Sequence, residues 1–195
     1  PSTEILCCAF SLGDADPIAW WQGMPEAELL KLEPIWDALE NPDVLVYAFN
    51  ASFEMFISLA LMEKTWGIKC PALSRFRCVM SMARRAALPS KLEKLAEVLN
   101  LSHQKDRRGK MLLKKFSMMQ PEGRPTKANP QGRPPYRIRP EDAPVLFAEL
   151  VEYCKQDVRA EKEAAAKLAY FDEPINSKNY TLDAVINARG VTVNL

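Results

Sequence analysis

The chain has 195 residues, of which 48% are hydrophobic and 26% are charged, a composition that excludes disorder along most of its length. No apolar run is long enough to cross a bilayer, so we expect no membrane-spanning segment. Twenty-six Lys and Arg against twenty-five Asp and Glu give a formal charge of +1, which as a total does not indicate a nucleic-acid-binding protein.

The first third of the chain predicts a hairpin, a helix and then a strand–helix unit. The apolar run Glu4–Leu12 ends at a glycine-containing turn and predicts a buried strand, with Pro17–Gln22 as its hairpin partner. Apolar residues at helical spacing predict a helix over Pro25–Leu39. Val44–Phe49 is short and apolar on both faces, which is typical of a central strand, and Ala51–Trp66 predicts the helix that follows it.

The rest of the chain predicts further helices around this unit. Residues 76–87 are expected to be helical, and Ser90–Glu93 carries a capping-box pattern that opens a helix over Leu92–Leu99. Val145–Tyr170 predicts a long amphipathic helix, and Tyr180–Leu195 predicts a short helix followed by a strand. Strands interleaved with helices indicate an α/β domain, and the initial hairpin favours a mixed sheet over a purely parallel one.

Residues 102–140 differ in chemistry from the rest of the chain. They contain eleven Lys and Arg, two acidic residues and six prolines, a local balance of +9, while the remainder has a balance of −8. Residues 121–135 have little apolar content and predict an extended loop. Closely spaced basic side chains suit the phosphates of a nucleic acid, and the alternative is a solvated surface with a linker. The candidate phosphate contacts are Lys105, Arg107, Arg108, Lys110, Lys114 and Lys115.

Cysteine and histidine usage argues against a zinc site. The chain has five cysteines without a Cys-x-x-Cys pair and a single histidine, His103, whereas structural zinc sites combine four such ligands at short spacings. An odd number of cysteines in a chain that forms a core is typical of a reducing, intracellular setting. We therefore expect a cytoplasmic protein.

Two pairs of polar residues lie where an α/β domain can place a site. Asn50 and Glu54 follow the predicted central strand, at the edge of the sheet where ligands bind in open α/β folds. Their alternative roles are a helix cap and a charge that interacts with the helix dipole. Tyr153 and Asp157 share one helical face at the margin of the buried stripe. Asp157 either has a partner or a cation there, or it is simply solvated.

Together these features indicate metal-dependent phosphodiester chemistry. A carboxylate after a central strand, another on a late helix and a basic segment between them suit two divalent cations about 4 Å apart. Such cations activate a water molecule and stabilise the leaving oxygen. Mg²⁺ and Mn²⁺ prefer carboxylate oxygens. The sequence therefore predicts Mg²⁺ or Mn²⁺ as the cofactor, with Glu54 and Asp157 as ligands.

Longer stretches around these residues resemble the 3′–5′ exonuclease domain of family A DNA polymerases, in its phage and prophage branch. YAFNASFE, at Tyr47–Glu54, is similar to the second motif of that family, with Phe49 where a histidine is usual. YCKQDV, at Tyr153–Val158, is similar to the third motif of the tyrosine-containing subclass. ALPSKLEKLAEVLNL and QKDRRGKMLLKKFS lie between them as in the phage branch, and Leu182–Asn194 resembles the connector toward the polymerase domain.

The resemblance implies an RNase H-like fold, a mixed sheet flanked by helices. It implies two-metal hydrolysis of 3′ nucleotides from single-stranded DNA during replication, in a bacterial cell or a phage-infected host. By the same resemblance Glu54 and Asp157 bind metal, Tyr153 orients the attacking water, and Asn50 supports the site. The implied partners are DNA and a polymerase domain.

One part of the family pattern is absent. The first motif of the family is an Asp-x-Glu on the first, central strand, whereas PSTEIL at the start of this chain resembles the second strand. We therefore expect residues 1–172 to form an exonuclease-like domain without that strand, with 102–140 as a basic insert and 173–195 as the connector. We expect little or no nuclease activity from this chain. Another segment, a second copy of the chain or a rearranged sheet is expected at the missing position.

A catalytically inactive nucleic-acid-binding or scaffolding domain of the same fold is the alternative function. Such a domain would keep the basic segment and bind DNA in a salt-dependent manner without divalent cations. A small-molecule α/β enzyme is disfavoured, because no glycine-rich phosphate loop follows any predicted strand in a chain with only seven glycines.

Overall fold

The computed structural model describes residues 4–102, 107–121 and 135–190. Within these residues strands and helices are interleaved as far as β4 (Phe76–Cys78) and helices follow, which confirms the predicted α/β class. None of the described helices is long and apolar enough to cross a membrane.

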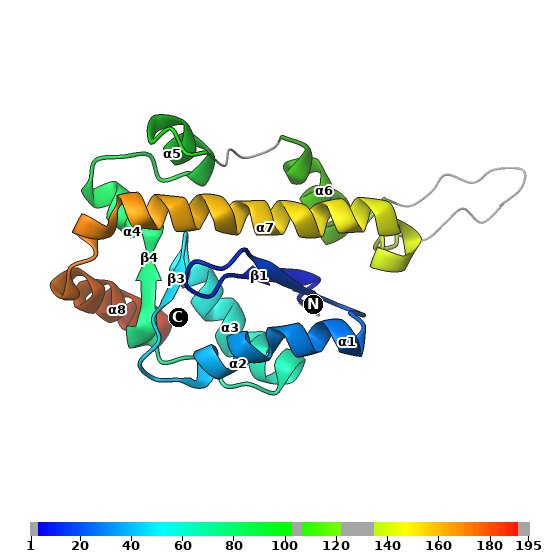
Figure 1. The fold of residues 1–195 in the computed structure, drawn as a ribbon, viewed down its shortest axis with the longest axis horizontal. Coiled ribbons are helices and arrows are strands. Elements are labelled where there is room, and N and C mark those ends of the chain that lie inside the picture. Colours follow the sequence, from blue (N-terminus) through cyan, green and yellow to red (C-terminus); the bar gives the residue numbers. More distant parts are fainter. Residues whose placement is uncertain (1–3, 103–106, 122–134, 191–195) are drawn as a thin grey trace, which may run out of the picture.

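The helix α7 (Pro144–Lys167) crosses the whole molecule (Figure 1). It contacts the strands β1 (Cys7–Phe10) and β2 (Ile18–Trp21) on one side and the helices α5 (Leu92–Val98) and α6 (Arg107–Ser117) on the other. Its N-terminal half belongs to one buried apolar cluster with α6, and its C-terminal end belongs to another with α5. The apolar stripe that predicted this helix from the sequence is therefore the surface on which the fold assembles.

The strands β1 and β2 pair antiparallel over all four of their residues, which confirms the predicted hairpin with shorter strands. Aromatic rings fix this hairpin to the helices beneath it. Trp66 lies edge-on to both Phe10 and Trp20, with ring centroids 5.8 and 5.4 Å apart, and Trp36 completes the group. Such ring pairs add roughly 1 kcal/mol each to the free energy gained by burying their area.

A parallel strand pair forms the second part of the fold. β3 (Val46–Ala48) and β4 (Phe76–Cys78) are joined by α3 (Ala51–Trp66), whose bounds are those predicted. The prediction of a helix over residues 76–87 was wrong at its start, where β4 lies, and the helix α4 (Val79–Arg85) follows. A three-residue strand carries no alternating pattern of its own, so pairing with β3 decides its conformation.

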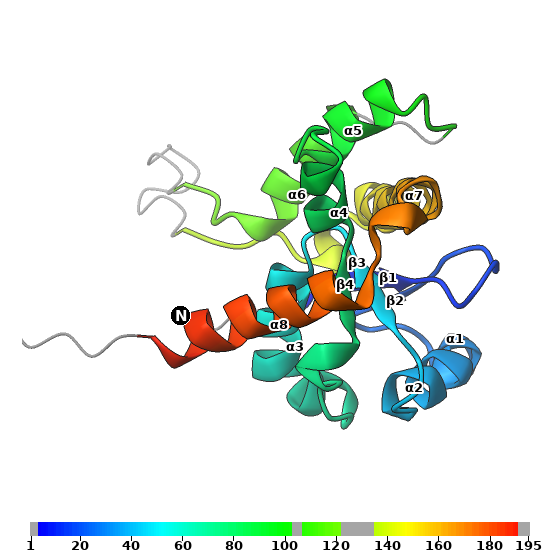
Figure 2. The same cartoon turned by 90° about the vertical axis from the view of Figure 1, so that its left-hand side faces the viewer.

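The four strands form two separate two-stranded sheets rather than the single mixed sheet that we expected. Among the described residues, β1 is hydrogen-bonded along one edge, to β2, and β3 along one edge, to β4. The expected single sheet does not form because no described strand pairs with both β1 and β3. The helix α3 links the two sheets instead: it packs on β3 and β4, and Trp66 at its end contacts Phe10 of β1 and Trp20 of β2 (Figure 2).

The predicted helix over Pro25–Leu39 is divided into three pieces. α1 (Glu26–Leu29) and α2 (Glu33–Glu40) are separated by the 3₁₀ turn η1 (Leu30–Leu32). Pro34 lies in the first turn of α2 and has no N–H to donate to the preceding turn. A helix that begins at such a proline is favoured over one that runs through it.

A buried arginine ties α2 to the parallel strands. Arg75 ends the 3₁₀ turn η2 (Leu73–Arg75) and is 7% exposed. Its guanidinium donates hydrogen bonds to the backbone carbonyls of Val44, Leu39 and Ala38 at 2.7, 2.6 and 2.9 Å. These carbonyls satisfy a charge that would otherwise be expensive to bury.

The predicted capping box of α5 is not formed. The residue at the N-cap is Lys91, and no side chain caps the helix. The hydroxyl of Ser90 accepts a hydrogen bond from Arg84 Nε at 3.0 Å, and Glu93 forms an ion pair with Lys110 of α6. Both side chains of the predicted box therefore bind partners from other elements.

Two 3₁₀ turns, η3 (Pro140–Asp142) and η4 (Ala169–Phe171), flank α7, and α8 (Pro174–Arg189) follows. The last helix thus starts earlier than the sequence predicted. It passes beside β4 and leaves the body of the molecule (Figure 2). The predicted final strand extends over residues 191–195, which lie outside the described residues, as does most of the predicted loop at 121–135.

Candidate metal and nucleic-acid site

Glu54 lies in the first turn of α3, directly after the parallel strand β3. Its side chain is half-buried, and burial raises the pKa of its carboxyl group. The Oε2 atom is buried and has no hydrogen-bond partner among the described residues. A buried carboxylate oxygen without a donor needs a proton, a water molecule or a cation.

Asn50 occupies the N-cap position of α3, as predicted, but its side chain does not cap the helix. Its backbone carbonyl accepts a hydrogen bond from the N–H of Phe53 at 2.8 Å. The predicted side-chain cap is therefore wrong. The backbone at Asn50, with φ −119° and ψ 68°, differs from the extended conformation that usually aims an N-cap side chain at the helix N–H groups.

Asp157 and Glu161 lie one turn apart on the same face of α7. The carboxyl group of Glu161 is buried and accepts a hydrogen bond from the backbone N–H of Phe49. Burial, together with the negative charges of Glu54 and Asp157, raises the pKa of Glu161 to about 8. The charges of Glu54 and Asp157, which are far apart in the sequence, thus both act on Glu161, and we call these three carboxyl groups the acidic cluster.

The sequence interpretation missed Glu161, although a signal was present. Residues four apart on a helix share a face, so Glu161 had to lie beside Asp157. Its burial depends on how α7 meets the end of β3, which no local pattern specifies.

Cysteine thiols border this cluster. Burial raises the pKa of Cys8, and the charges of Cys154, Glu54 and Glu161 raise it further. Cys7 and Cys154 are joined by a hydrogen bond between their thiols, which together with burial raises the pKa of Cys7. Cys7 and Cys8 thus stay protonated at neutral pH, and a neutral thiol is a poor metal ligand. These two thiols line the cluster as small apolar side chains.

Tyr153, one turn before Asp157, packs against α6. A Cβ built on Gly109 would lie 2.0 Å from two carbon atoms of the Tyr153 ring, so only glycine fits at this position. The ring also contacts the buried cluster that Phe116 and Phe147 form between α6 and α7. The predicted water-orienting tyrosine is therefore held by the helix that carries the basic residues.

The carboxylates match a hard divalent cation in donor type. Mg²⁺ and Mn²⁺ prefer such oxygens, and the donor-free Oε2 of Glu54 fits a position beside a cation. However, within the described ranges no group of three or more His, Cys, Asp or Glu side chains is arranged to hold a metal ion. The donor chemistry fits, whereas these residues alone do not complete a ligand set.

The basic residues of α6 fall into two groups. Arg108 forms an ion pair with Glu149 of α7 at 2.7 Å, and Lys110 pairs with Glu93 of α5. Lys114 and Lys115 form no ion pair with any residue that the structure describes. Lys105 lies outside the described residues, and so does the side chain of Arg107, the first residue of α6.

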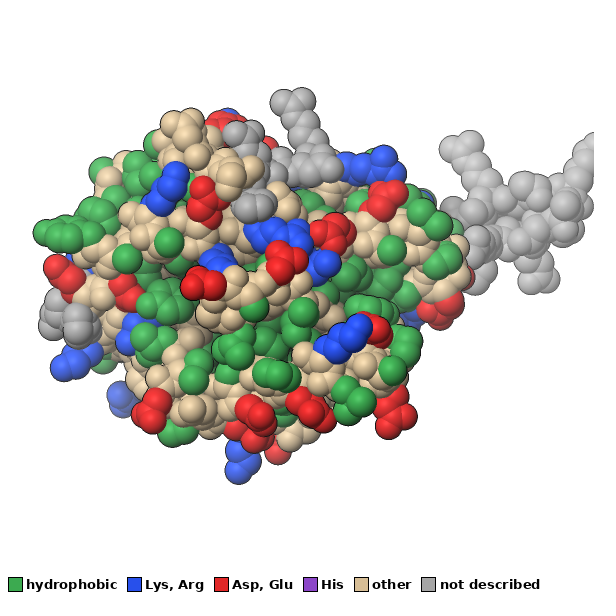
Figure 3. All heavy atoms as spheres, viewed as in Figure 1, with side chains coloured by type: hydrophobic (Ala, Val, Ile, Leu, Met, Phe, Trp, Pro, Cys, Tyr) green, Lys and Arg blue, Asp and Glu red, His purple; other side chains and the backbone are tan. Residues whose placement is uncertain are grey.

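The face of the molecule shown in Figure 3 does not present one continuous basic field. On the face shown in Figure 3, basic and acidic side chains are interspersed over α7 and its neighbours. One acidic residue of the first turn, Asp16, forms an ion pair with Arg159 of α7, with Oδ1 2.8 Å from Nε. Asp16 therefore connects the hairpin to α7.

Comparison with known proteins shows that the chain is similar to part of a phage DNA polymerase. The chain is 33% identical over 204 residues to the DNA polymerase of Bacillus phage SP02, in an alignment that covers 100% of this chain and 28% of that protein. The chain thus spans little more than a quarter of the length of this relative. No family model matches the chain, and no solved structure matches it.

Proposed function

We propose that this chain forms the 3′–5′ exonuclease-like region of a phage-type DNA polymerase, with an RNase H-like arrangement of its strands. The observation that carries the proposal is that Glu54, after a parallel strand, and Asp157, on the long helix, both raise the pKa of Glu161 by their charges. Both belong to segments that resemble exonuclease motifs. The similarity to a phage DNA polymerase along the whole chain supports it.

Each part of the cluster has a proposed role in the longer polymerase. Glu54 and Asp157 would hold Mg²⁺ or Mn²⁺, which when bound stabilises the charge that develops on the phosphate and lowers the pKa of a bound water. Tyr153, which is held against Gly109, would orient that water. Residues 1–172 would form the exonuclease-like domain and 173–195 the connector to the polymerase domain. This chain by itself would have little activity, because its ligand set is incomplete.

Manganese binding tests the proposed site directly. Electron paramagnetic resonance of Mn²⁺ added to the chain should show weak binding that E54Q and D157N each reduce by about tenfold or more, since even residues that only support metal ligands contribute that much. The matched control is E152Q on α7, because Glu152 is exposed and pairs with Arg159 and Lys155. Unchanged Mn²⁺ binding in both E54Q and D157N would refute the assignment.

A catalytically inactive nucleic-acid-binding domain is the second candidate. The observation that favours it is that no group of three or more His, Cys, Asp or Glu side chains among the described residues is arranged to hold a metal ion. The two functions differ in their need for a cation. An inactive domain binds single-stranded DNA equally well with EDTA and with Mg²⁺, and Mn²⁺ does not bind at Glu54 and Asp157.

The DNA contacts are predicted to depend on Lys114 and Lys115. These lysines have no acidic partner among the described residues, whereas Arg108 and Lys110 are already paired. K114Q/K115Q should reduce the slope of log affinity for single-stranded DNA against log salt by about 1.4, at about 0.7 per lost phosphate contact. Fluorescence anisotropy over a salt series measures this slope.

Two exposed lysines elsewhere provide the control for this measurement. Lys64 and Lys69 lie at and beyond the end of α3, far along the chain from α6. K64Q/K69Q removes the same total charge and should leave the slope unchanged. Equal slopes for the two double variants would show that α6 is not the contact surface.

A further inference from the structure

A cavity lies on the other side of α3 from the acidic cluster. It has a volume of about 410 Å³ and opens between α3, α4 and α8, beyond the carboxyl end of β4. Ser52 lines it, two residues before Glu54, and two residues along a helix turn the side chain by about 200°. The helix α3 therefore separates this cavity from the acidic cluster.

Two arginines of α4 give the cavity its positive charge. Arg84 donates from Nε to Ser90 at 3.0 Å and forms no ion pair with any described residue. Arg85 donates from Nη1 to the carbonyl of Phe171 at 2.6 Å, and Glu173 lies 3.6 Å from its Nη2. Each guanidinium has five N–H donors, so both retain donors after these contacts. Two neighbouring guanidinium groups that retain N–H donors can bind the oxygens of a phosphate.

The remaining polar groups suit the sugar of a nucleotide rather than a bare anion. Asp183 of α8 lines the cavity and forms no ion pair in the described part of the chain. Its carboxylate repels a free anion but accepts a hydrogen bond from a sugar hydroxyl or a base amine. The hydroxyls of Ser52 and Tyr180, 2.7 Å apart, fix the wall between α3 and α8.

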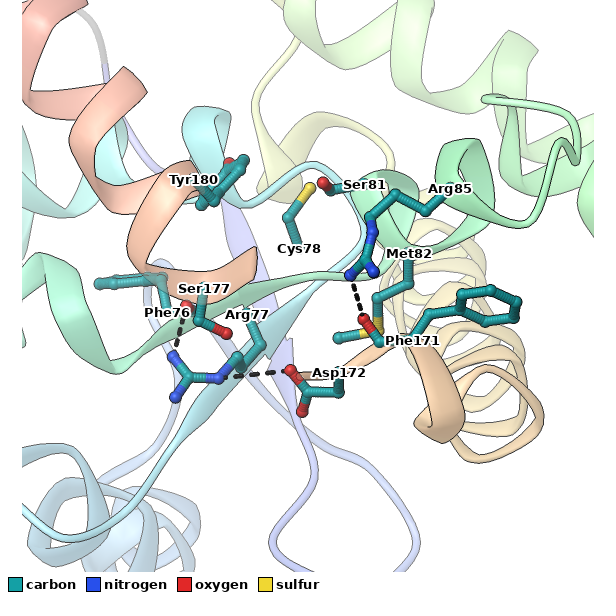
Figure 4. A pocket seen from close by; sticks show the side chains of 10 residues that line it. All are labelled: Phe76, Arg77, Cys78, Ser81, Met82, Arg85, Phe171, Asp172, Ser177 and Tyr180. Atoms are coloured by element: carbon teal, nitrogen blue, oxygen red, sulfur yellow. Dashed lines mark hydrogen bonds and ion pairs between the residues drawn. The ribbon is translucent and has the colours of Figure 1, made fainter. Parts of the chain in front are cut away.

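Figure 4 shows the smaller pocket that adjoins this cavity and shares Cys78, Ser81, Arg85 and Tyr180 with it. The guanidinium of Arg85 points toward the carbonyl of Phe171, and Tyr180 lies on the other side of Cys78 and Ser81. Arg77 and Asp172 close the far side of the small pocket through an ion pair with a separation of 3.4 Å. Two residues of the wall that the cavity and the small pocket share are held by such contacts: Tyr180 by Ser52, and Arg85 by Phe171 and Glu173.

We infer that the cavity between α3, α4 and α8 binds a nucleoside phosphate, with the phosphate on Arg84 and Arg85 and a donor of the sugar or base on Asp183. A volume of about 410 Å³ lies in the range of small-molecule sites. The ligand is either a free nucleotide or one nucleotide of a DNA strand. This site is separate from the proposed metal site and does not depend on it.

Calorimetric titration of the full chain in EDTA tests the inference, because without divalent cations the acidic cluster binds no metal–nucleotide complex. Thymidine 5′-monophosphate should bind about tenfold more tightly than thymidine or inorganic phosphate, each of which lacks one of the two contacts. R84Q should weaken the nucleotide about tenfold, and R84K should restore part of the loss. D183N should weaken the nucleotide but not inorganic phosphate.

A control variant and a second ligand, oligothymidylate, distinguish a free nucleotide from a nucleotide within a DNA strand. K94Q on α5 is the matched charge control, because Lys94 pairs with Glu97 away from the cavity. If R84Q also weakens oligothymidylate, the ligand is a nucleotide within a strand, and if only the monophosphate is affected, it is a free nucleotide. Absence of nucleotide binding, equal binding of inorganic phosphate, or binding unaffected by both R84Q and D183N would overturn the inference.

Discussion

Replacing Gly109 with alanine is expected to lower the free energy of unfolding by roughly 3 kcal/mol, at the upper end of the usual cost of overpacking. The new Cβ would lie 2.0 Å from ring atoms of Tyr153, so the two helices α6 and α7 must separate. At an exposed helical position the same change stabilises by up to about 1 kcal/mol. The sign of the effect therefore reports whether α6 packs on Tyr153. Denaturation in urea measures it.

A double variant identifies the cause of this loss. In G109A/Y153A the ring is absent, so the alanine at 109 should cost less than it does when Tyr153 is present, giving a clear coupling energy. S117A is the control on α6, because Ser117 is exposed and bonds only within its own helix. A G109A protein that is more stable than the wild type would show that α6 does not dock in this way. Weaker DNA binding should accompany the loss, because α6 carries Lys114 and Lys115.

Local signals specified some elements well. The bounds of α3 were predictable because a strand precedes it and Gly67 ends it in the left-handed conformation, with φ 72°. The hairpin of β1 and β2 followed from two short apolar runs around a turn. By contrast, β4 exists only through its pairing with β3, and the two separate sheets reflect which strands meet. Such non-local pairings leave no mark in a short window of sequence.

The sequence predicted which residues are candidates for the site, but not how these residues are buried or which partners they have. The sequence indicated Glu54 as a candidate ligand because it follows the predicted central strand, and Asp157 because it lies at the margin of the buried stripe of the long helix. It did not indicate the burial of Glu161, since that results from three elements meeting. Nor did it indicate that Arg108 and Lys110 are paired with acidic residues of other helices. Partners depend on packing, and packing is a property of the whole chain.

Glu161 is expected to make the protein less stable as the pH rises, in the absence of divalent cations. Its pKa is about 8 in the folded chain, against an ordinary value of 4.5. Below pH 4.5 both states hold the proton, and between these values only the folded state does, so each pH unit lowers the free energy of unfolding by about 1.4 kcal/mol. The loss reaches about 3 kcal/mol at pH 7 and stops growing above the folded pKa.

E161Q should abolish this part of the pH dependence. Its amide oxygen still accepts the Phe49 N–H, and its NH₂ group can donate to the carboxylates of Glu54 and Asp157 that raise the pKa of Glu161. The thiols of Cys8 and Cys154 also face the cluster, but they stay in place in both proteins. The difference between wild type and E161Q in urea denaturation, measured from about pH 5 to about pH 8, therefore isolates Glu161.

A cation bound in the acidic cluster should weaken this pH dependence of the free energy of unfolding. Mn²⁺ beside Glu54 and Asp157 favours ionised carboxylates, so it should lower the pKa of Glu161 and flatten the wild-type profile toward that of E161Q. E161A removes the acceptor of the Phe49 N–H and should lose stability at every pH, unlike E161Q. Identical pH profiles for the wild type and E161Q without metal would show that Glu161 is not buried among the other carboxylates. A profile that Mn²⁺ leaves unchanged would show that the cluster does not bind the cation.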